Sequence, residues 1–252
     1  MELQGKRALV TGGGAGIGKA VAEVFAREGA KIIINDLSSS GEEVAKAVGG
    51  VFIQADLSSQ AEVEELAEKA LREGPIDILV NNAGLQRIHP VDEFPRETWN
   101  LLLQVLLTAP FQLIKAMLPG MKERRWGRIL NIASIHALVA SPNKSAYITA
   151  KHGLLGLTKT VALEAAEHGI TCNAICPAYV KTAIVESQIA DQARTLNIPE
   201  AEVIEKVMLA PAALKRLIEP QEVAEFALFL ASEKGSAITG SAQTMDLGWT
   251  AR

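Results

Sequence analysis

Three side chains in the middle of the sequence have the types and spacing that proton-transfer chemistry requires. Ser134 is followed by Tyr147 and then, four residues later, by Lys151. If residues 145–167 form a helix, Tyr147 and Lys151 share one face, and an ammonium lies beside a phenol. A neighbouring cation stabilises the phenolate and should lower the tyrosine pKa from about 10 toward the working range. Tyr147 is therefore a candidate general acid or base.

The elements that would position these residues alternate between strands and helices. Short apolar runs predict strands at residues 7–11, 31–35, 51–54, 76–81, 127–133 and 170–175. Longer amphipathic segments predict helices at 16–28, 41–48, 59–73, 96–122 and 145–167. A repeated strand-helix-strand order is typical of a parallel sheet with helices on both faces. We therefore expect an α/β fold.

The chain is expected to form a single domain over residues 1–252, because no linker rich in Pro, Gly or Ser divides it. The segment 182–216 differs from the rest: it is helical in composition but is broken by Pro199 and Pro211. It also follows the sixth predicted strand directly. A helical segment at this place can close over a site, so we expect it to be a lid.

Composition and charge narrow the class of protein. The chain has 48% hydrophobic and 21% charged residues, which is typical of a soluble protein with a substantial core. Its formal net charge of -4 argues against nucleic acid as a partner. No apolar stretch is expected to reach the length of a membrane span, and the first residues lack the hydrophobic segment of a signal peptide. We expect a cytoplasmic protein that does not bind membranes.

Two cysteines, Cys172 and Cys176, flank Asn173-Ala174-Ile175 in a strand-like run. An extended backbone holds them too far apart for easy bridging, and two thiols are too few for a structural zinc site. We expect buried free thiols and no metal site.

A glycine-rich turn follows the first predicted strand and opens the first predicted helix. Glycine lets the backbone turn tightly and approach a pyrophosphate, while the helix N-terminus offers unpaired N–H groups to the anion. A tight turn without any ligand is the alternative. The candidate cofactor residues in this turn are Gly12, Gly14, Ala15, Gly16, Ile17 and Gly18.

Asp36 closes the second predicted strand, where an acidic side chain can bind a ribose 2'-hydroxyl and repel a 2'-phosphate. This position favours NAD over NADP. The alternative is a helix cap or turn residue, although Ser38 to Ser40 could provide the cap instead. Further candidates follow the third and fourth predicted strands, where open α/β sheets bind ligands and where turn formers are also common. These residues are Asp56, Leu57, Asn82, Ala83 and Gly84.

Along essentially its whole length, the chain resembles the short-chain dehydrogenase/reductase family. The matching motifs are Thr11-Gly12-x-x-x-Gly16-x-Gly18, Asn81-Asn82-Ala83-Gly84, Ser134 and Tyr147-x-x-x-Lys151, in family order and spacing. The resemblance implies a Rossmann-like, doubly wound parallel sheet, hydride transfer at a nicotinamide, and a homotetramer.

The same resemblance assigns roles to individual residues. It implies that Tyr147 is the acid/base, that Ser134 polarises the substrate oxygen, and that Lys151 activates the tyrosine and binds the ribose. Three residues after the sixth predicted strand would lie on the nicotinamide side of the cofactor. They are Pro177, Val180 and Thr182.

A closer resemblance is to the bacterial D-3-hydroxybutyrate dehydrogenase subfamily. It is carried by residues 82–86, 134–136, 143–147, 185–188 and 248–252. In that subfamily the positions that match Gln86, His136, Lys144 and Gln188 hold the substrate carboxylate. The position that matches Trp249 belongs to the pocket wall.

Physical chemistry supports this carboxylate set. An uncompensated charge in a closed site is costly, so Lys144 would supply the opposite charge. Gln86, Gln188 and His136 would supply hydrogen bonds that fix the orientation of the substrate. Taken singly, each has an ordinary alternative: a solvated lysine, a satisfied histidine, an exposed glutamine, or, for Trp249, a core or subunit-interface residue. As a set on loops around one strand edge, they favour the substrate interpretation.

The chain departs from the family pattern at Leu106. The family usually has an asparagine there, which helps hold a water that relays protons to the lysine, and leucine cannot bind water. Pro110 lacks a backbone N–H and is expected to kink the same helix locally. Proton release is therefore expected to be slower or rerouted.

The leading hypothesis is an NAD-dependent oxidoreductase that interconverts (R)-3-hydroxybutyrate, or a similar short 3-hydroxy acid, and its 3-oxo acid. Tyr147 would be its acid/base. One alternative is a dehydrogenase or reductase of another small alcohol, polyol or ketone on the same scaffold. The other is a cofactor-binding protein with weak catalysis, which the leucine at position 106 motivates.

Overall fold

The computed structural model describes residues 1–196 and 198–251. In this part of the chain, seven parallel strands form one sheet in the order β3-β2-β1-β4-β5-β6-β7. The strand order reverses between β1 and β4, which is where ligands bind in doubly wound sheets. The strands are β1 (Arg7–Thr11), β2 (Lys31–Asp36), β3 (Val51–Gln54), β4 (Ile78–Asn81), β5 (Gly127–Ile132), β6 (Ile170–Pro177) and β7 (Ala242–Met245).

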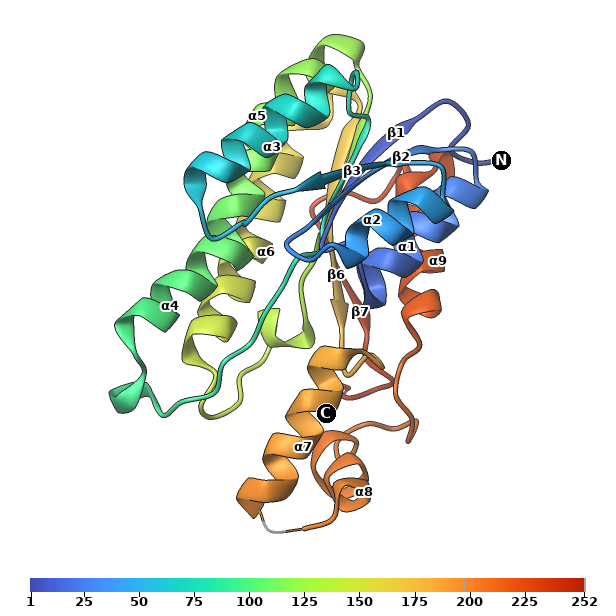
Figure 1. The fold of residues 1–252 in the computed structure, drawn as a ribbon. Helices are drawn as coiled ribbons and strands as arrows, with labels where there is room; N and C mark the ends of the chain where they lie inside the picture. The colour runs from blue at the N-terminus through green and yellow to red at the C-terminus, as the bar shows by residue number, and fades with distance from the viewer. Residues whose placement is uncertain (197, 252) are drawn as a thin grey trace.

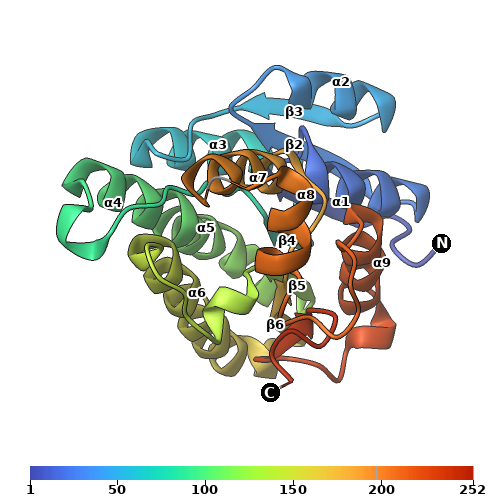
Figure 2. The same ribbon diagram turned by 90° about the horizontal axis from the view of Figure 1, so that it is seen from below.

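Helices cover both faces of the sheet (Figures 1 and 2). They are α1 (Gly16–Arg27), α2 (Ser40–Ala47), α3 (Gln60–Arg72), α4 (Arg96–Leu103), α5 (Ala109–Arg124), α6 (Ser145–Ala165), α7 (Ala183–Leu196), α8 (Glu200–Glu202) and α9 (Pro220–Ala231). Seen from the end where α7 and α8 lie, α3 to α6 are on one side and α1 and α9 on the other. The predicted Rossmann-like α/β class is confirmed.

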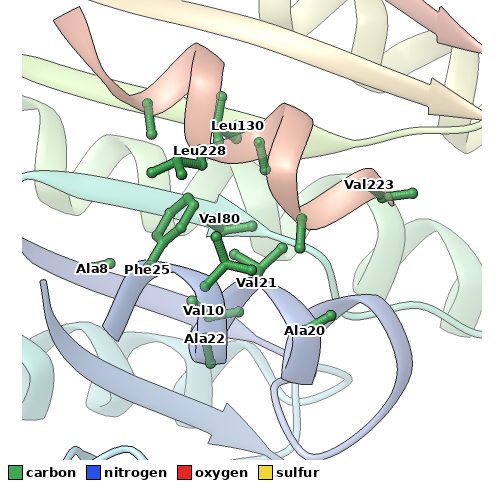
Figure 3. Close-up of a cluster of buried hydrophobic side chains, with 14 of the residues drawn as sticks. Ala8, Val10, Ala20, Val21, Ala22, Phe25, Val80, Leu130, Val223 and Leu228 are labelled. Carbon is green, nitrogen blue, oxygen red and sulfur yellow. The ribbon is translucent and has the colours of Figure 1, made fainter. Parts of the chain in front are cut away.

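The five central strands, β2, β1, β4, β5 and β6, bury both of their faces, which explains why they are apolar runs in the sequence. In β1, Ala8 and Val10 belong to the core beneath α1 and α9, whereas Leu9 belongs to the core beneath α3 and α5. Figure 3 shows the first of these cores, with Phe25 and Val21 of α1 facing Leu228 of α9.

Most predicted elements are present, with their ends shifted by a few residues. Two elements were missed: α9, and the edge strand β7. The β7 strand has the sequence Ala-Gln-Thr-Met, and none of its residues is fully buried, so it has no apolar run to signal a strand. The predicted lid at 182–216 contains α7, α8 and a π-helical stretch, Val203–Met208. Position 197 of that range lies outside the described residues.

The predicted helix at 96–122 is one continuous helix over Arg96–Arg124, but its middle is not α-helical. The stretch Gln104–Thr108 is a π-helix that ends just before Pro110. Because Pro110 has no N–H to donate, the i to i−4 hydrogen-bond pattern cannot continue through it. The local distortion expected at Pro110 therefore takes the form of a π-helical turn.

This helix also corrects an expectation about apolar stretches. Its most apolar 18-residue window has a mean hydropathy of 1.7, so by length and composition it could cross a membrane. Of that window, 44% is buried inside the protein. The buried residues pack beneath the sheet together with α3 and α6, an environment that gives a core helix the same composition.

Candidate active site

A cavity of about 700 Å³ opens at the carboxyl ends of the strands. Every residue that the sequence predicted for the cofactor, the substrate or catalysis lines it, except Gly14, Gly18 and Trp249. Gly14 uses its N–H to donate to Asp36 Oδ2 at 2.9 Å. Gly18 packs so closely on the turn that a Cβ built on it would lie 2.1 Å from the Gly12 carbonyl oxygen. Both glycines thus shape the turn from behind the cavity wall.

The turn after β1 is held by hydrogen bonds from the end of β4. The Asn82 side-chain amide donates to the carbonyl oxygens of Thr11 at 2.9 Å and Gly12 at 3.0 Å. The hydroxyl oxygen of Thr11 accepts from the backbone N–H groups of Asn82 and Ala83. Gly12 has a φ of +61°, which favours glycine.

The N-terminus of α1 is open toward the cavity. No side chain caps it, and its first turn has no acidic residue. Gly16 and Ile17 of this turn line the cavity. Unpaired N–H groups at a helix N-terminus attract anions, so the turn fits the pyrophosphate of the predicted dinucleotide.

Asp36 lines the cavity and is also a turn residue. Besides the bond to Gly14, its Oδ1 accepts from the Ser38 N–H at 2.9 Å. Asp36 thus makes the turn contacts of the alternative that the sequence left open, and it also lines the cavity. The two turn bonds fix the carboxylate at the cavity wall, beside the glycine-rich turn.

Helix α6 is anchored to the sheet by a buried polar chain. Asn81 Nδ2 donates to Asn131 Oδ1 at 2.8 Å, and Asn131 Nδ2 donates to Thr158 Oγ1 at 2.9 Å. This chain links β4, β5 and α6. It fixes the position of α6, which carries Tyr147 and Lys151 into the cavity wall below Ser134 of the β5 loop.

Tyr147 and Lys151 share one helix face, as the spacing predicts, but the tyrosine pKa is not lowered. The Lys151 ammonium lies 5.6 Å from the centroid of the Tyr147 ring and donates to the Ile132 carbonyl oxygen at 2.7 Å. Burial raises the pKa of Tyr147 to about 12, and a hydrogen bond with Ser134 only partly opposes this rise. Burial likewise lowers the pKa of Lys151 to about 8. Desolvation thus outweighs the expected effect of the cation.

The four predicted carboxylate ligands line the same cavity as Tyr147; they are Gln86, His136, Lys144 and Gln188. Lys144 is only 8% exposed, and no acidic side chain in the described ranges pairs with it. Gln188 of α7 donates to Gln86 Oε1 at 3.3 Å. Among the residues that the sequence predicted for the substrate, the buried atoms Gln86 Nε2, His136 Nδ1 and Trp249 Nε1 have no hydrogen-bond partner.

His136 is the centre of this group. Its ring centroid lies 6.2 Å from that of Tyr147 and 6.5 Å from that of Trp249. Its Nε2 lies 2.9 Å from Ser141 Oγ. Burial, followed by the positive charge of Lys144, lowers the pKa of His136 to about 4, so the imidazole is neutral at neutral pH.

Several cavity-lining residues were missed by sequence reasoning. The apolar ones include Leu85, Leu101, Val105 and Val185; the polar ones include Asn35, Arg87 and Tyr179. Asn35 and Arg87 adjoin predicted site residues, and this adjacency was the signal available for them. Leu101 and Val105 come from the helix after β4, and only the packing of that helix shows that they reach the cavity.

Leu106 is 1% exposed and packs with Leu102, Ala146 and Ala150, beside Tyr147. The position at which the family resemblance implies a water-binding asparagine is therefore apolar. The slower or rerouted proton release expected from this leucine stays a prediction.

Cys172 and Cys176 are buried and free, as expected. Burial raises the pKa of Cys176 to about 11 and that of Cys172 to about 12, so both are thiols at neutral pH. Within residues 1–196 and 198–251, no group of three or more His, Cys, Asp or Glu side chains is arranged to hold a metal ion.

Comparisons with known proteins cover nearly the whole chain. A family model described as enoyl-(acyl carrier protein) reductase matches residues 12–250. D-beta-hydroxybutyrate dehydrogenase of Rhizobium meliloti is 47% identical over 98% of this chain and 99% of that protein. D-beta-hydroxybutyrate dehydrogenase of Cupriavidus necator is 42% identical over 99% of this chain and 100% of that protein.

A solved structure is similar across the same length. The crystal structure titled ribose-5-phosphate isomerase from Brucella melitensis has a TM-score of 0.88 and 35% identity, and covers 99% of this chain and 93% of that chain. The descriptions of these relatives differ in reaction. The comparisons therefore agree on the fold and the family rather than on one substrate.

The buried neutral His136 predicts a pH-dependent stability. Its pKa is about 4 in the folded protein, against an ordinary value of 6.5. Between these values the unfolded chain binds more protons, so the free energy of unfolding falls as the pH falls. From about pH 7 to about pH 5, His136 should cost roughly 2 kcal/mol of stability. Urea unfolding at both pH values should show this extra loss in the wild type but not in His136→Asn.

The matched control is His168→Asn, which removes a histidine from the turn before β6. It should keep the wild-type loss. An equal loss in wild type and His136→Asn would contradict the neutral state of His136.

Proposed function

Because this chain belongs to the short-chain dehydrogenase/reductase family of oxidoreductases, we propose that it interconverts (R)-3-hydroxybutyrate, or a similar short 3-hydroxy acid, and its 3-oxo acid, using NAD. Family membership implies a nicotinamide nucleotide cofactor. The identity of the substrate and the choice of NAD over NADP go beyond what family membership implies. The finer proposal is supported by the two relatives named D-beta-hydroxybutyrate dehydrogenase and by the polar groups of the cavity.

The observation that carries the proposal is the unpaired charge of Lys144. A buried ammonium without a counter-ion is unfavourable, and burial accordingly lowers the pKa of Lys144. The same cavity is lined by Gln86 and His136, whose unpartnered nitrogens can donate hydrogen bonds. A site of one cation and several donors is complementary to an anion. A substrate carboxylate would supply both the missing charge and the missing acceptors.

Anchoring the carboxylate determines where the rest of the acid lies. Lys144 immediately precedes α6, and Tyr147 follows one turn later, so a short chain held at Lys144 reaches Tyr147 and Ser134. The Ser134 hydroxyl accepts from the His136 backbone N–H at 3.1 Å and also hydrogen-bonds with Tyr147, so the two hydroxyl groups can share one substrate oxygen. Tyr147 exchanges the hydroxyl proton, and Ser134 stabilises the developing carbonyl.

The cofactor would occupy the part of the cavity that the glycine-rich turn and Asp36 line. The open N-terminus of α1 would hold the pyrophosphate, Asp36 the adenosine ribose, and Lys151 the nicotinamide ribose. When bound there, the nicotinamide supplies the hydride acceptor or donor. The carboxylate of Asp36 supports NAD, because it would repel the 2'-phosphate of NADP.

The protonation state of Tyr147 affects which direction of the reaction is favoured. With a pKa of about 12, its phenol is protonated at neutral pH and is ready to donate a proton to a 3-oxo acid. The oxidative direction needs the phenolate, which a higher pH favours.

The proposal includes a cytoplasmic homotetramer. Phe111 of α5 is 48% exposed and Leu163 of α6 is 82% exposed, which supports an apolar contact between copies through these helices. The two free thiols suit a reducing compartment.

The direct test follows NADH formation spectrophotometrically with both enantiomers of 3-hydroxybutyrate and with NAD or NADP. Turnover should be fastest with the (R)-enantiomer and NAD. If no short 3-hydroxy acid is turned over, the proposal is wrong.

Replacement of Lys144 tests the carboxylate directly. Lys144→Ala should raise KM for the acid by about 100-fold, because a buried charge pair is worth about 3 kcal/mol. The affinity for NADH should change little. Lys46→Ala on the exposed face of α2 is the control and should behave as the wild type. An unchanged KM in Lys144→Ala would favour a neutral alcohol or ketone as substrate.

Tyr147→Phe should reduce turnover by about 10²- to 10⁴-fold, because it removes the proton donor. NADH affinity, measured by fluorescence titration, should stay nearly intact. Tyr179→Phe is the matched control, since Tyr179 is the other tyrosine of the chain and also lines the cavity. Its loss should be less than about tenfold. Retained turnover in Tyr147→Phe would refute the role of the phenol.

A further inference from the structure

We propose that Ser141 is a positioning residue that sets the tautomer of His136, so that Nδ1 carries the proton and donates it to the substrate carboxylate. The inference rests on the proposed function for the identity of the acceptor. It adds a residue that does not line the cavity.

The contact that motivates the inference lies on the side of the His136 ring away from its unpartnered atom. Ser141 Oγ is 2.9 Å from Nε2, and it has no other hydrogen bond in the described residues. Nδ1 is buried and has no partner. The ring therefore has one nitrogen engaged by Ser141 and the other left for a ligand.

The ring is only 4% exposed, and its low pKa keeps it neutral, so it has a single N–H. A neutral imidazole places its proton on one nitrogen and a lone pair on the other. A proton on Nε2 would leave a lone pair at Nδ1, which would repel a carboxylate. A proton on Nδ1 makes that atom a donor, and Nε2 must then accept.

A hydroxyl is suited to this task because it can donate. When the Ser141 O–H donates to Nε2, the lone pair of Nε2 is satisfied and the proton must lie on Nδ1. With Nδ1 protonated, His136 and Lys144 can both bind the same carboxylate.

Backbone geometry holds the two residues in place. His136 lies in the 3₁₀ turn Ile135–Ala137, and its N–H donates to Ser134 Oγ. Ser141 follows five residues later on the loop before α6. The hydrogen bond between them joins the two ends of residues 136–141. It therefore links the turn after Ser134 to the segment that leads to Lys144.

The first experiment compares Ser141→Ala with Ser141→Thr, which keeps the hydroxyl. Ser141→Ala should raise KM for (R)-3-hydroxybutyrate about five- to tenfold, the equivalent of one hydrogen bond, with a smaller change in kcat. Ser141→Thr should restore the wild-type KM. An unchanged KM in Ser141→Ala would overturn the proposal.

The second experiment separates tautomer control from simple loop packing. In His136→Asn the side-chain amide places a donor near the position of Nδ1 and needs no partner at Nε2. Adding Ser141→Ala to His136→Asn should therefore leave KM within twofold of the single variant. A full five- to tenfold loss in this background would show that Ser141 supports the loop and not the tautomer.

The third experiment does not depend on turnover. Selective ¹⁵N-histidine labelling, with the His136 signal identified by its loss in His136→Asn, reports which ring nitrogen is protonated. The wild type should show a protonated Nδ1, and Ser141→Ala should shift the population toward a protonated Nε2. A wild-type ring protonated at Nε2 would overturn the inference. If no hydroxy acid is turned over but the tautomer shift is seen, the proposed function fails while the role of Ser141 stands.

Discussion

The docking of α6 on the parallel sheet is the constraint on which the site depends. Asn131 of β5 donates to Thr158 in the middle of this helix, and Lys151 donates to the carbonyl of Ile132 at the end of the same strand. The helix is rigid, so these two bonds fix its position and rotation together. Tyr147, and Lys144 just before the helix, are placed by the same contacts. The packing of α6 on the sheet thus positions both the proton donor, Tyr147, and the cation proposed to bind the substrate, Lys144.

Burial then determines the chemical state of the groups that α6 and its neighbours present. It raises the pKa of Tyr147 and lowers the pKa values of Lys144, Lys151 and His136. In each case the uncharged form gains, because desolvation penalises charge. The site is therefore poorly solvated and rich in unsatisfied donors. Such a site is unfavourable by itself and becomes favourable when an anion brings acceptors and charge into it.

Sequence patterns predicted the sheet well where strands are buried on both faces, because an apolar run is then obligatory. They failed for β7, whose residues are half-exposed and lack such a run. They also predicted the helix at 96–122 but not its π-helical turn before Pro110. That turn depends on how the backbone accommodates a missing N–H against the packed sheet.

The sequence by itself determined which chemistry-bearing residues are present and which elements carry them. The spacing of Tyr147 and Lys151 sets their common helix face, since helical periodicity is local. The tertiary structure decided the protonation of these groups, the unpaired state of Lys144 and the contact between Ser141 and His136. Desolvation and hydrogen-bond satisfaction depend on which distant segments enclose a side chain. No local pattern encodes that enclosure.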